Sequence, residues 1–420
     1  MDRTRAAALR LLTSATDEGR LLAEVEGDVL GPLPGPERAR ARRLAVATLR
    51  WRDRADRALG PFLRVKPYPE VLNALRLALV EIRVERGAAH GVVGAMVEIV
   101  KAGERTAGQA GLVNAVLRNV LRQPPESWDA LPLPRLPKWL RKPLVADYGK
   151  ATVAAMEAVF AASPPLDLTV RDDAGGWAAK LGAEVLPTGS LRLRDAGQVS
   201  LLPGYAEGAW WVQDAAAAIP VQVLAPRPGE RVLDLCAAPG GKTLQLAARG
   251  AEVTALDLSG PRMARVTENL SRCGLKANTV IADALDWMPD VPFDAVLLDA
   301  PCTATGTIRR HPDLPVAKTG DSFPALFALQ ERLIDRALTL VRPGGRVVFC
   351  TCSLLIDEGE EQIRDAVLRN PGTGVDTAPL HLPGIEPGWI GPEGLRLRPD
   401  FWAGRGGMDG FFVAVLRRSA

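Results

Sequence analysis

Apolar residues return at helical spacing through the N-terminal part of the chain. Over residues 1–125 they recur every three or four positions, with little of the strict alternation that is typical of strands. The clearest amphipathic stretch runs from Gly111 to Leu121 and places Leu112, Val116 and Val120 on one face. The pattern predicts an all-α bundle for this part of the chain.

The pattern changes twice after this bundle. Prolines interrupt it repeatedly, which predicts a linker with short helices over residues 126–163. Short alternating runs then predict a small α+β subdomain over residues 164–228. The expected elements of this subdomain are strands at Leu166 to Arg171, Ser190 to Leu193 and Ala209 to Val212, and a helix at Gly176 to Leu181.

Over residues 229–420 the pattern alternates between strand and helix at regular intervals. Such alternation is typical of an α/β fold in which helices cover a doubly wound parallel sheet. The expected strands are Val232 to Leu235, Glu252 to Asp257, Thr279 to Ala282, Ala295 to Asp299, Arg346 to Cys350 and Gly410 to Leu416. The expected helices are Thr243 to Arg249, Arg262 to Cys273 and Leu326 to Leu340.

Length and composition fit this division into domains. A chain of 420 residues exceeds what one hydrophobic core usually organises, and 47% hydrophobic with 24% charged residues is typical of a globular protein. The opening stretch, Met1 to Arg20, lacks the unbroken apolar run of a secretory signal, and no apolar run elsewhere is long enough to cross a bilayer. We therefore expect a cytoplasmic protein without membrane contact, and we expect it to be a monomer.

The cysteines are expected to be free thiols. There are five of them, an odd number, and none lies in a C-x-x-C pair. With only three histidines in the chain, a structural zinc site is not expected, and we predict no metal.

Charge is distributed unevenly along the chain. The formal net charge is +3, but the first 122 residues carry 21 Lys and Arg against 14 Asp and Glu. A basic N-terminal module is what a domain that holds nucleic acid would look like. An ordinary arginine-rich helical surface explains the same count equally well.

The turn after the first strand of the large sheet, Cys236 to Thr243, is a candidate ligand site. In open α/β sheets ligands bind at the carboxyl ends of strands, and a glycine pair lets backbone approach them closely. A phosphate-binding P-loop requires G-x-x-x-x-G-K-[ST], and Gly241 to Thr243 match its second half. However, Cys236 occupies the position of the first glycine and Pro239 restricts the loop. The separated glycines of a dinucleotide-binding motif are also missing.

Three successive strands each bring an aspartate to this edge of the sheet. Asp257 lies where a carboxylate accepts hydrogen bonds from the two hydroxyls of a ribose. Asp283 is placed to accept from an adenine amino group, and Asp299 follows on the next strand. These positions predict a ligand that carries adenosine without needing phosphate. S-adenosylmethionine fits, because its positive sulfonium favours carboxylate neighbours.

Two cysteines are expected at the same edge, Cys302 after Pro301 and Cys352 at the end of the next strand. Two neighbouring thiols could form a redox pair, a soft-metal site, or a nucleophile with a partner. Cytosine methylation at carbon 5 would explain the pair: one thiolate adds to carbon 6, and a second basic group nearby assists loss of the proton from carbon 5. A carboxyl group, here Asp299, stabilises the charge that develops at ring nitrogen 3. The residues alone do not choose between the two nucleophiles.

Four motifs together resemble the Sun/Fmu-type 16S ribosomal RNA (cytosine-5) methyltransferase family. They are Asp234 to Thr243 (DLCAAPGGKT), Asp299 to Cys302 (DAPC), Arg309 to Asp313 (RRHPD) and Thr351 to Ser353 (TCS). The resemblance extends over the whole chain. It implies a Rossmann-like, S-adenosylmethionine-dependent methyltransferase domain preceded by a NusB-like RNA-binding bundle.

The resemblance also implies roles for individual residues. Cys352 of the Thr-Cys-Ser motif would attack the cytosine, and Cys302 would assist product release. After Cys302 the family usually has Ser-Gly-Thr-Gly, whereas this chain has Thr303-Ala-Thr-Gly306. The stretch Leu314 to Ser322 also lacks a tryptophan that the resemblance leads us to expect. The implied cofactor contacts are Cys236, Ala237, Ala238, Pro239, Gly240, Gly241, Lys242, Asp257, Asp283 and Asp299.

The expected partner is RNA, most of all 16S ribosomal RNA. Two alternatives stay open at this point. One is cytosine-5 methylation of transfer RNA. The other is a non-catalytic RNA-binding or ribosome assembly factor with a methyltransferase fold, although a pure scaffold has no need of both cysteines.

Overall fold

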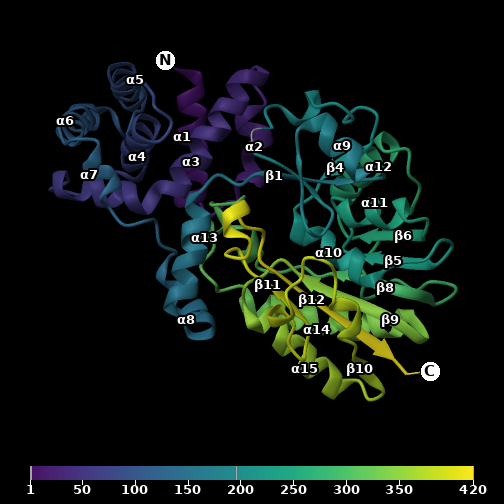
Figure 1. Ribbon diagram of the computed structural model, residues 1–420. Coiled ribbons are helices and arrows are strands. Elements are labelled where there is room, and N and C mark those ends of the chain that lie inside the picture. Colours follow the sequence, from purple (N-terminus) through teal and green to yellow (C-terminus); the bar gives the residue numbers. More distant parts are fainter. Residues whose placement is uncertain (1, 195, 420) are drawn as a thin grey trace. The chain divides into compact units, whose positions relative to one another are not determined.

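The computed structural model describes residues 2–194 and 196–419, so the outer limits of the expected domains, residues 1 and 420, lie outside the described part. The chain divides into two compact units (Figure 1). The first comprises Met1–Ala162 and Ile308–Asp321, and the second comprises Ser163–Thr307 and Ser322–Ala420. No helix in the described part of the chain has the length and apolarity that a membrane span requires.

The first unit is entirely helical, as the periodicity predicted. Apolar side chains of α1, α3 and α4 meet in its core, where Leu11, Leu44 and Leu75 are buried. Its helices are α1 (Arg3–Thr16), α2 (Leu22–Leu30), α3 (Gly35–Leu59), α4 (Pro69–Arg83), α5 (Ala89–Ala102), α6 (Ala110–Leu121), α7 (Glu126–Asp129), α8 (Lys138–Ala161) and α13 (Leu314–Ala317).

Where the proline pattern predicts a linker with short helices, the structure has the four-residue α7 and then α8. Gly149, with φ of 80° and ψ of 159°, divides α8 into two shorter helical pieces. Pro137 precedes its first turn, where a missing N–H costs nothing. Leu140 in the first piece, and Val153 and Met156 in the second, are buried.

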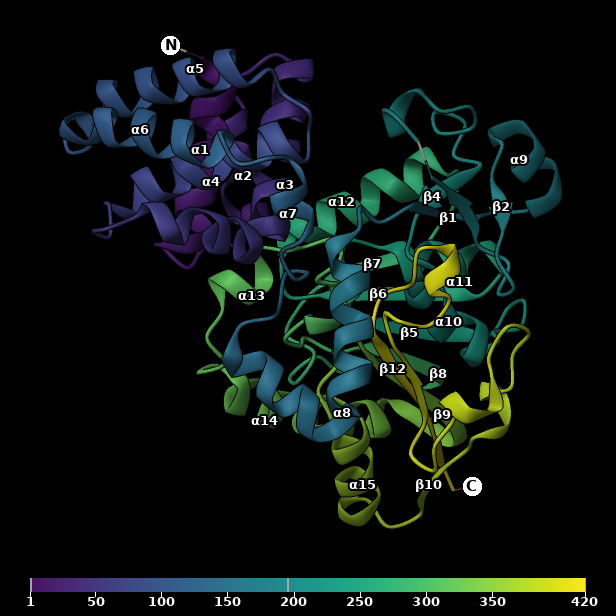
Figure 2. The ribbon, with the colours of Figure 1, turned by 60° about the vertical axis from the view of Figure 1, so that its left-hand side comes forward.

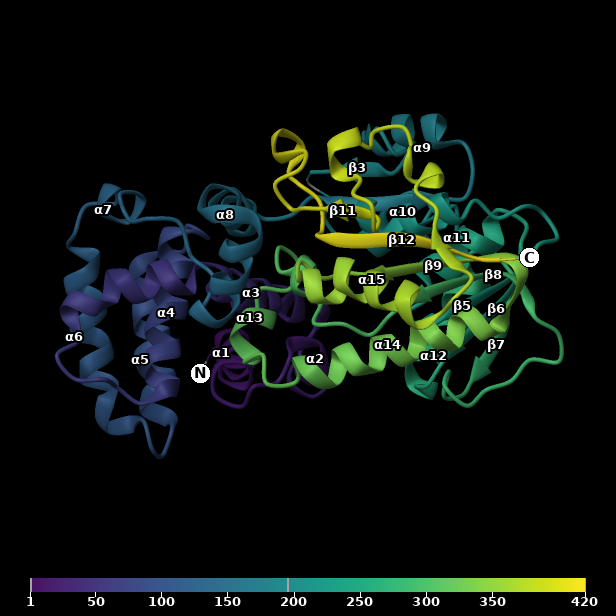
Figure 3. The same cartoon turned by 90° about the horizontal axis from the view of Figure 1, so that it is seen from below.

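The segment Ile308–Asp321 belongs to the helical unit although its sequence neighbours do not. Asp313 Oδ2 accepts a hydrogen bond from the Leu22 N–H at 2.9 Å, and Arg50 Nη1 donates to the Arg309 carbonyl at 2.8 Å. Helix α13 packs beside α1 (Figure 3). The RRHPD motif, expected within the catalytic domain, therefore folds as part of the helical unit.

The second unit contains a small antiparallel sheet of order β2-β3-β1-β4. The buried Arg192 and Asp167 hold its centre through two hydrogen bonds of 2.6 Å. Its strands are β1 (Leu166–Val170), β2 (Glu184–Val185), β3 (Leu191–Leu193) and β4 (Trp210–Val212), and its helix is α9 (Ala174–Leu181). The expected α+β subdomain is thus present, with the added short strand β2.

The large sheet has the order β10-β12-β9-β8-β5-β6-β7, with β11 paired to β12 (Figure 2). The neighbours from β9 to β7 are parallel, whereas β10, β11 and β12 pair antiparallel. Its strands are β5 (Arg231–Leu235), β6 (Glu252–Asp257), β7 (Asn278–Ile281), β8 (Phe293–Asp299), β9 (Val341–Thr351), β10 (Thr373–Val375), β11 (Leu395–Leu397) and β12 (Phe411–Arg418).

Helices cover both faces of this sheet, which confirms the doubly wound α/β expectation (Figure 3). Leu233 and Val296 pack on one side with α14 and α15, while Val232 and Ala295 pack on the other with α10. The helices are α10 (Ala215–Leu224), α11 (Gly241–Ala248), α12 (Gly260–Arg272), α14 (Phe323–Leu340) and α15 (Glu360–Arg369). The carboxyl ends of β5, β6, β7, β8 and β9 consequently share one edge.

Candidate active site

The pairing of β8 with β9 brings the two candidate thiols together. The strands are parallel and Asp299 lies opposite Cys350. After β8 the chain passes Pro301 and reaches Cys302, and directly after β9 it reaches Cys352. Their Sγ atoms lie 3.5 Å apart, within sulfur hydrogen-bonding distance, and both side chains are partly buried.

A close backbone crossing fixes the loop that carries Cys302. The Gly306 N–H donates to the Cys352 carbonyl at 2.9 Å, and the Gly410 N–H donates to the Gly306 carbonyl at 2.9 Å. A Cβ atom on Gly306 would lie 1.9 Å from the Gly410 oxygen. Only glycine therefore allows this loop to approach the neighbouring strands so closely.

A buried carboxylate, Glu358, holds the residue next to Cys302. Glu358 Oε1 accepts from the Thr303 N–H and from Gln330 Nε2, both at 2.9 Å, and its Oε2 accepts from the Thr303 hydroxyl at 2.5 Å. Glu358 itself is fully buried. The sequence expectations did not include it, because a single glutamate six residues after Cys352 carries no motif.

Hydroxyl groups connect the two cysteine loops below the thiols. Thr305 Oγ1 lies 3.1 Å from Ser353 Oγ and accepts from the Leu354 N–H at 2.9 Å. Thr303 Oγ1 lies 3.2 Å from the same serine oxygen. In the sequence these groups are visible only as a threonine after Cys302 and a serine after Cys352. Their hydroxyl groups lie 50 residues apart in the chain, so only the fold shows that they interact.

The surroundings of the Cys302 thiol disfavour its ionised form. The hydrogen bond with Cys352, burial, and the negative charges of Cys352 and Glu358 raise the pKa of Cys302 well above its usual value. Cys302 therefore keeps its proton at neutral pH. The three other cysteines behave as core residues: burial raises the pKa of Cys273, Cys350 and Cys236, the last to about 12.

Lys242 connects the glycine loop to β8. Its Nζ forms an ion pair with Asp299 Oδ2 at 2.7 Å, and its side chain is buried. Burial opposes the charge, but Asp299 outweighs it and keeps the pKa of Lys242 above its usual value. A P-loop lysine must reach a phosphate, whereas this lysine is already paired with a carboxylate. The structure therefore argues against the nucleoside triphosphatase alternative.

The aspartates lie at successive strand ends, as expected. Asp257 is buried, and its oxygens accept from the Ala238 N–H at 3.1 Å and the Ser259 N–H at 2.9 Å. Asp283 is exposed two residues after β7 and accepts from the Leu285 N–H at 2.9 Å. Asp257 and the glycine loop are thus in direct contact, whereas Asp283 lies at the end of the next strand.

The loop geometry fits an adenosine ligand. Cys236 and Gly240 adopt φ of 62° and 101°, which turn the chain sharply between β5 and α11. Asp234, fully buried below the turn, accepts from the Thr243 hydroxyl at 2.6 Å, and burial raises its pKa to about 7. The charged groups at this edge are mainly carboxylates, which suit ribose hydroxyls and a sulfonium and repel phosphate. In the described part of the chain no cluster of His, Cys, Asp or Glu is arranged to hold a metal ion.

Comparison with known sequences gives matches to two families and to individual relatives. Residues 221–417 match the family described as 16S rRNA methyltransferase RsmB/F, and residues 2–122 match the NusB family. Ribosomal RNA small subunit methyltransferase B of Xanthomonas campestris pv. campestris is 37% identical, over 99% of this chain and 97% of that protein. The protein of the same name from Pseudomonas putida is 36% identical, over 90% of this chain and 89% of its own.

Solved structures share the fold. The crystal structure of PH0851 covers 98% of this chain and 99% of its own, with a TM-score of 0.75 and 23% sequence identity. A methyltransferase homologue from Pyrococcus horikoshii covers 67% of this chain and 95% of its own, with a TM-score of 0.57 and 27% identity.

Replacing Ala304 by glycine should stabilise the protein. Ala304 has φ of 57°, a left-handed conformation that costs an L-residue roughly 1–2 kcal/mol, part of which the greater freedom of glycine in the unfolded chain cancels. We expect Ala304→Gly to raise the free energy of unfolding by about 0.5–1 kcal/mol in urea denaturation. Ala304→Val, whose branched side chain disfavours this conformation, should lower it. Equal free energies of unfolding for the wild-type protein and the two variants would show that the left-handed conformation of Ala304 does not destabilise the fold.

Replacing Glu358 by glutamine should lower the pKa of Cys302, because the negative charge that opposes its ionisation is removed while the side chain keeps its shape. The rate at which iodoacetamide alkylates the Cys302 peptide, followed by mass spectrometry against pH, measures this pKa. The matched control is Glu361→Gln, which removes a charge from a solvent-exposed neighbour. An identical pH profile in all three proteins would show that Glu358 does not act on the thiol.

Proposed function

The chain belongs to the ribosomal RNA small subunit methyltransferase B family, and from this premise we propose that it transfers a methyl group from S-adenosylmethionine to carbon 5 of a cytosine in 16S ribosomal RNA. The observation that carries the proposal is the pair of thiols 3.5 Å apart beside the Lys242–Asp299 ion pair. These groups would provide a nucleophile, a proton acceptor and a carboxyl group for cytosine-5 chemistry.

Cys352 is the proposed nucleophile. Carbon 5 of cytosine takes up a methyl group only after a thiolate has added to carbon 6 and raised the electron density of the ring. Cys302 is held as a thiol by the causes that raise its pKa, so it can donate a hydrogen bond to Cys352 and stabilise a thiolate there. The choice of Cys352 over Cys302 rests on the family resemblance.

Cys302 is the proposed helper in the second half of the reaction. Two of the causes that raise its pKa are the hydrogen bond and the charge of Cys352. Both disappear once the sulfur of Cys352 is bonded to carbon 6, so the pKa of Cys302 falls during catalysis. Cys302 can then release its proton to solvent and, as a thiolate, accept the proton on carbon 5, while the electron pair of the breaking bond to carbon 6 returns to the Cys352 sulfur and the product leaves.

Asp299 and Lys242 are placed to act on the pyrimidine ring. Asp299 keeps 32% of its side chain exposed while Lys242 holds one of its oxygens. A carboxyl group in this position would, when protonated, donate a hydrogen bond to ring nitrogen 3, and the Lys242 ammonium beside it would stabilise the negative charge that develops when the thiolate adds. The ion pair fixes the carboxyl orientation before the base arrives.

The glycine loop and the strand-end aspartates would hold the cofactor. S-adenosylmethionine supplies an electrophilic methyl group when it is bound. Asp257 would accept from the ribose hydroxyls and Asp283 from the adenine amino group, while Cys236 to Lys242 would pass close to the amino acid part through their backbone. Fixed carboxylates on the strand ends orient the cofactor toward the edge that carries the thiols.

The two cysteine variants should differ in kind. Cys352→Ala should abolish methyl transfer to 16S ribosomal RNA while S-adenosylmethionine binding, measured by calorimetry, persists. Cys302→Ala should trap a covalent adduct with the RNA, because addition to carbon 6 remains possible and release does not. The measurement is a denaturing gel of labelled RNA with each variant. An active Cys352→Ala protein, or no adduct with Cys302→Ala, would contradict this assignment of roles.

The RNA target can be identified in cells. Bisulfite sequencing of total RNA, with and without the protein, should show one 16S cytosine that loses its protection from deamination when the protein is absent. Loss of protection in transfer RNA instead would overturn the proposed substrate. Unchanged protection in every RNA, together with no S-adenosylmethionine binding, would favour the assembly factor.

A further inference from the structure

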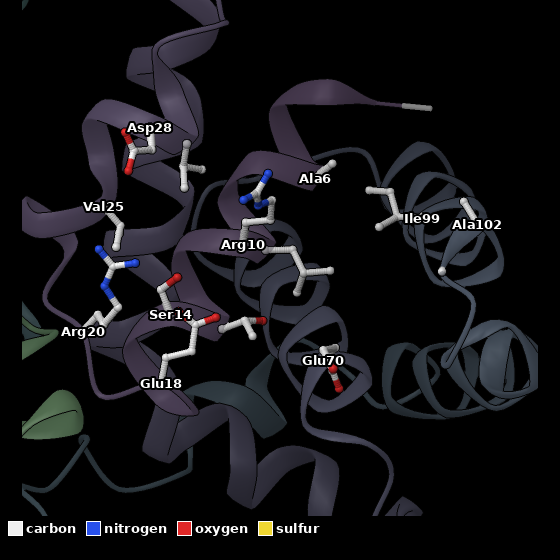
Figure 4. A pocket seen from close by; sticks show the side chains of 14 residues that line it. Ala6, Arg10, Ser14, Glu18, Arg20, Val25, Asp28, Glu70, Ile99 and Ala102 are labelled. Atoms are coloured by element: carbon white, nitrogen blue, oxygen red, sulfur yellow. The ribbon is translucent and has the colours of Figure 1, made fainter.

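Two cavities in the described part of the helical unit differ in electrostatic character. The larger, of about 610 Å³, has apolar walls, and charged groups of both signs line it (Figure 4). Arg10 and Arg20 are balanced there by Glu18, Asp28 and Glu70. The larger cavity therefore has no preference for an anion.

The smaller cavity, of about 260 Å³, is lined by basic side chains whose charge is not balanced. It lies among α3, the stretch before α8, the end of α8, and the segment that includes α13. Its four cations are Arg50, Arg52, Arg135 and Lys138.

Three carboxylates also line the smaller cavity, but each is already paired with an arginine outside its lining. Asp53 pairs with Arg57 at 2.8 Å. Asp56 binds Arg76 through two hydrogen bonds of 2.6 and 2.9 Å. Glu157 pairs with Arg141 at 2.9 Å. The cations of the lining thus retain an excess of positive charge.

Arg50 and Arg52 are two lining arginines whose positive charge is disfavoured by burial. Arg50 Nη1 donates to the carbonyl groups of Phe160, Ala162 and Arg309, and burial together with the charge of Arg309 lowers its pKa to about 10. Nε of Arg52 is buried without a hydrogen-bond partner. Burial and the nearby charge of Arg76 also lower the pKa of Arg52, and the carboxylates of Asp56, Asp17 and Asp53 offset part of this effect. A buried guanidinium donor without an acceptor is costly and calls for a ligand.

We propose that the smaller cavity binds a phosphate group of the RNA backbone, with Arg52 as its central donor. A guanidinium matches phosphate oxygens in geometry and charge, and the partly buried position makes the pairing stronger than at an exposed site. The inference rests on the proposed function, because it takes RNA as the substrate. It adds a specific contact in the helical unit, independent of the thiols and of the cofactor loop.

The proposed phosphate site is lined in part by the segment Ile308–Asp321, which follows the Cys302 loop in the chain. Pro312 and Val316 form part of the cavity wall, and the Arg309 carbonyl is held by Arg50. Thr307 is the last residue of the second unit before this segment. A bound phosphate therefore contacts the stretch of chain that begins directly after that loop.

The test compares two variants of α3 that each remove one positive charge. Arg52→Gln removes the donor in the cavity, whereas Arg43→Gln removes a solvent-exposed arginine that pairs with Glu85. Binding of a labelled 16S ribosomal RNA transcript is measured by fluorescence anisotropy at several salt concentrations. We expect Arg52→Gln to weaken binding about tenfold and to reduce the salt slope by about one, since one phosphate contact is lost. Arg43→Gln should weaken it about twofold at most, because exposed charges are screened. Equal effects of the two variants would overturn the proposal.

Stability separates a binding role of Arg52 from a structural one. Its Nε has no partner in the protein, so Arg52→Gln should leave the midpoint of urea unfolding unchanged or raise it. A clear loss of stability would show that Arg52 supports the fold instead.

Inorganic phosphate distinguishes a backbone site from a site for a free anion. At matched ionic strength, phosphate should raise the melting temperature of the wild-type protein relative to chloride, and Arg52→Gln should remove this shift. A shift that Arg52→Gln removes while RNA binding stays intact would identify a free-anion site and contradict the RNA contact. Failure of the proposed function would differ from all of these results: the wild-type protein would bind the transcript with the expected difference between variants but would methylate no cytosine.

Discussion

The parallel pairing of β8 with β9 is the constraint on which the active site depends. Parallel strands end at the same edge of a sheet, so the residues that follow them meet without any special loop. Asp299 opposite Cys350 sets the register, and the two thiols then lie two or three residues beyond it. The glycine crossing at Gly306 and the hydroxyl groups around Ser353 refine this position, but they operate only within the register that the two strands impose.

Much of this arrangement could be inferred from residues, and the reason is physical. Alternating strands and helices dictate a parallel sheet, and any residue placed after such a strand reaches a known edge. The aspartates and both thiols follow that rule. Glu358 and the Lys242–Asp299 pair do not, because a partner 55 or 57 residues away is invisible to local periodicity. Helix α10 was also missed: it is buried on nearly all sides, so its sequence shows no amphipathic alternation.

The ambiguity of the glycine loop is settled by charge. Half of the P-loop pattern is present in the sequence, and a lysine that follows two glycines ordinarily indicates a phosphate ligand. In the fold the same lysine is buried against a carboxylate, and the neighbouring strand ends carry further acids. A motif therefore acquires its meaning from the charge of the groups that the sheet brings beside it. Charge likewise distinguishes the two cavities of the helical unit: positive groups exceed negative ones in the lining of the smaller cavity, which includes Arg52, but not in that of the larger.

The excursion of Ile308–Asp321 into the helical unit has a consequence for the history of the chain. A domain joined end to end can be gained or lost by a single recombination event at its boundary. Here the helical unit is completed by 14 residues encoded far downstream, in the middle of the catalytic region. Neither unit is encoded by one uninterrupted piece of gene, so a recombination event that separated the two would leave the helical unit without this segment.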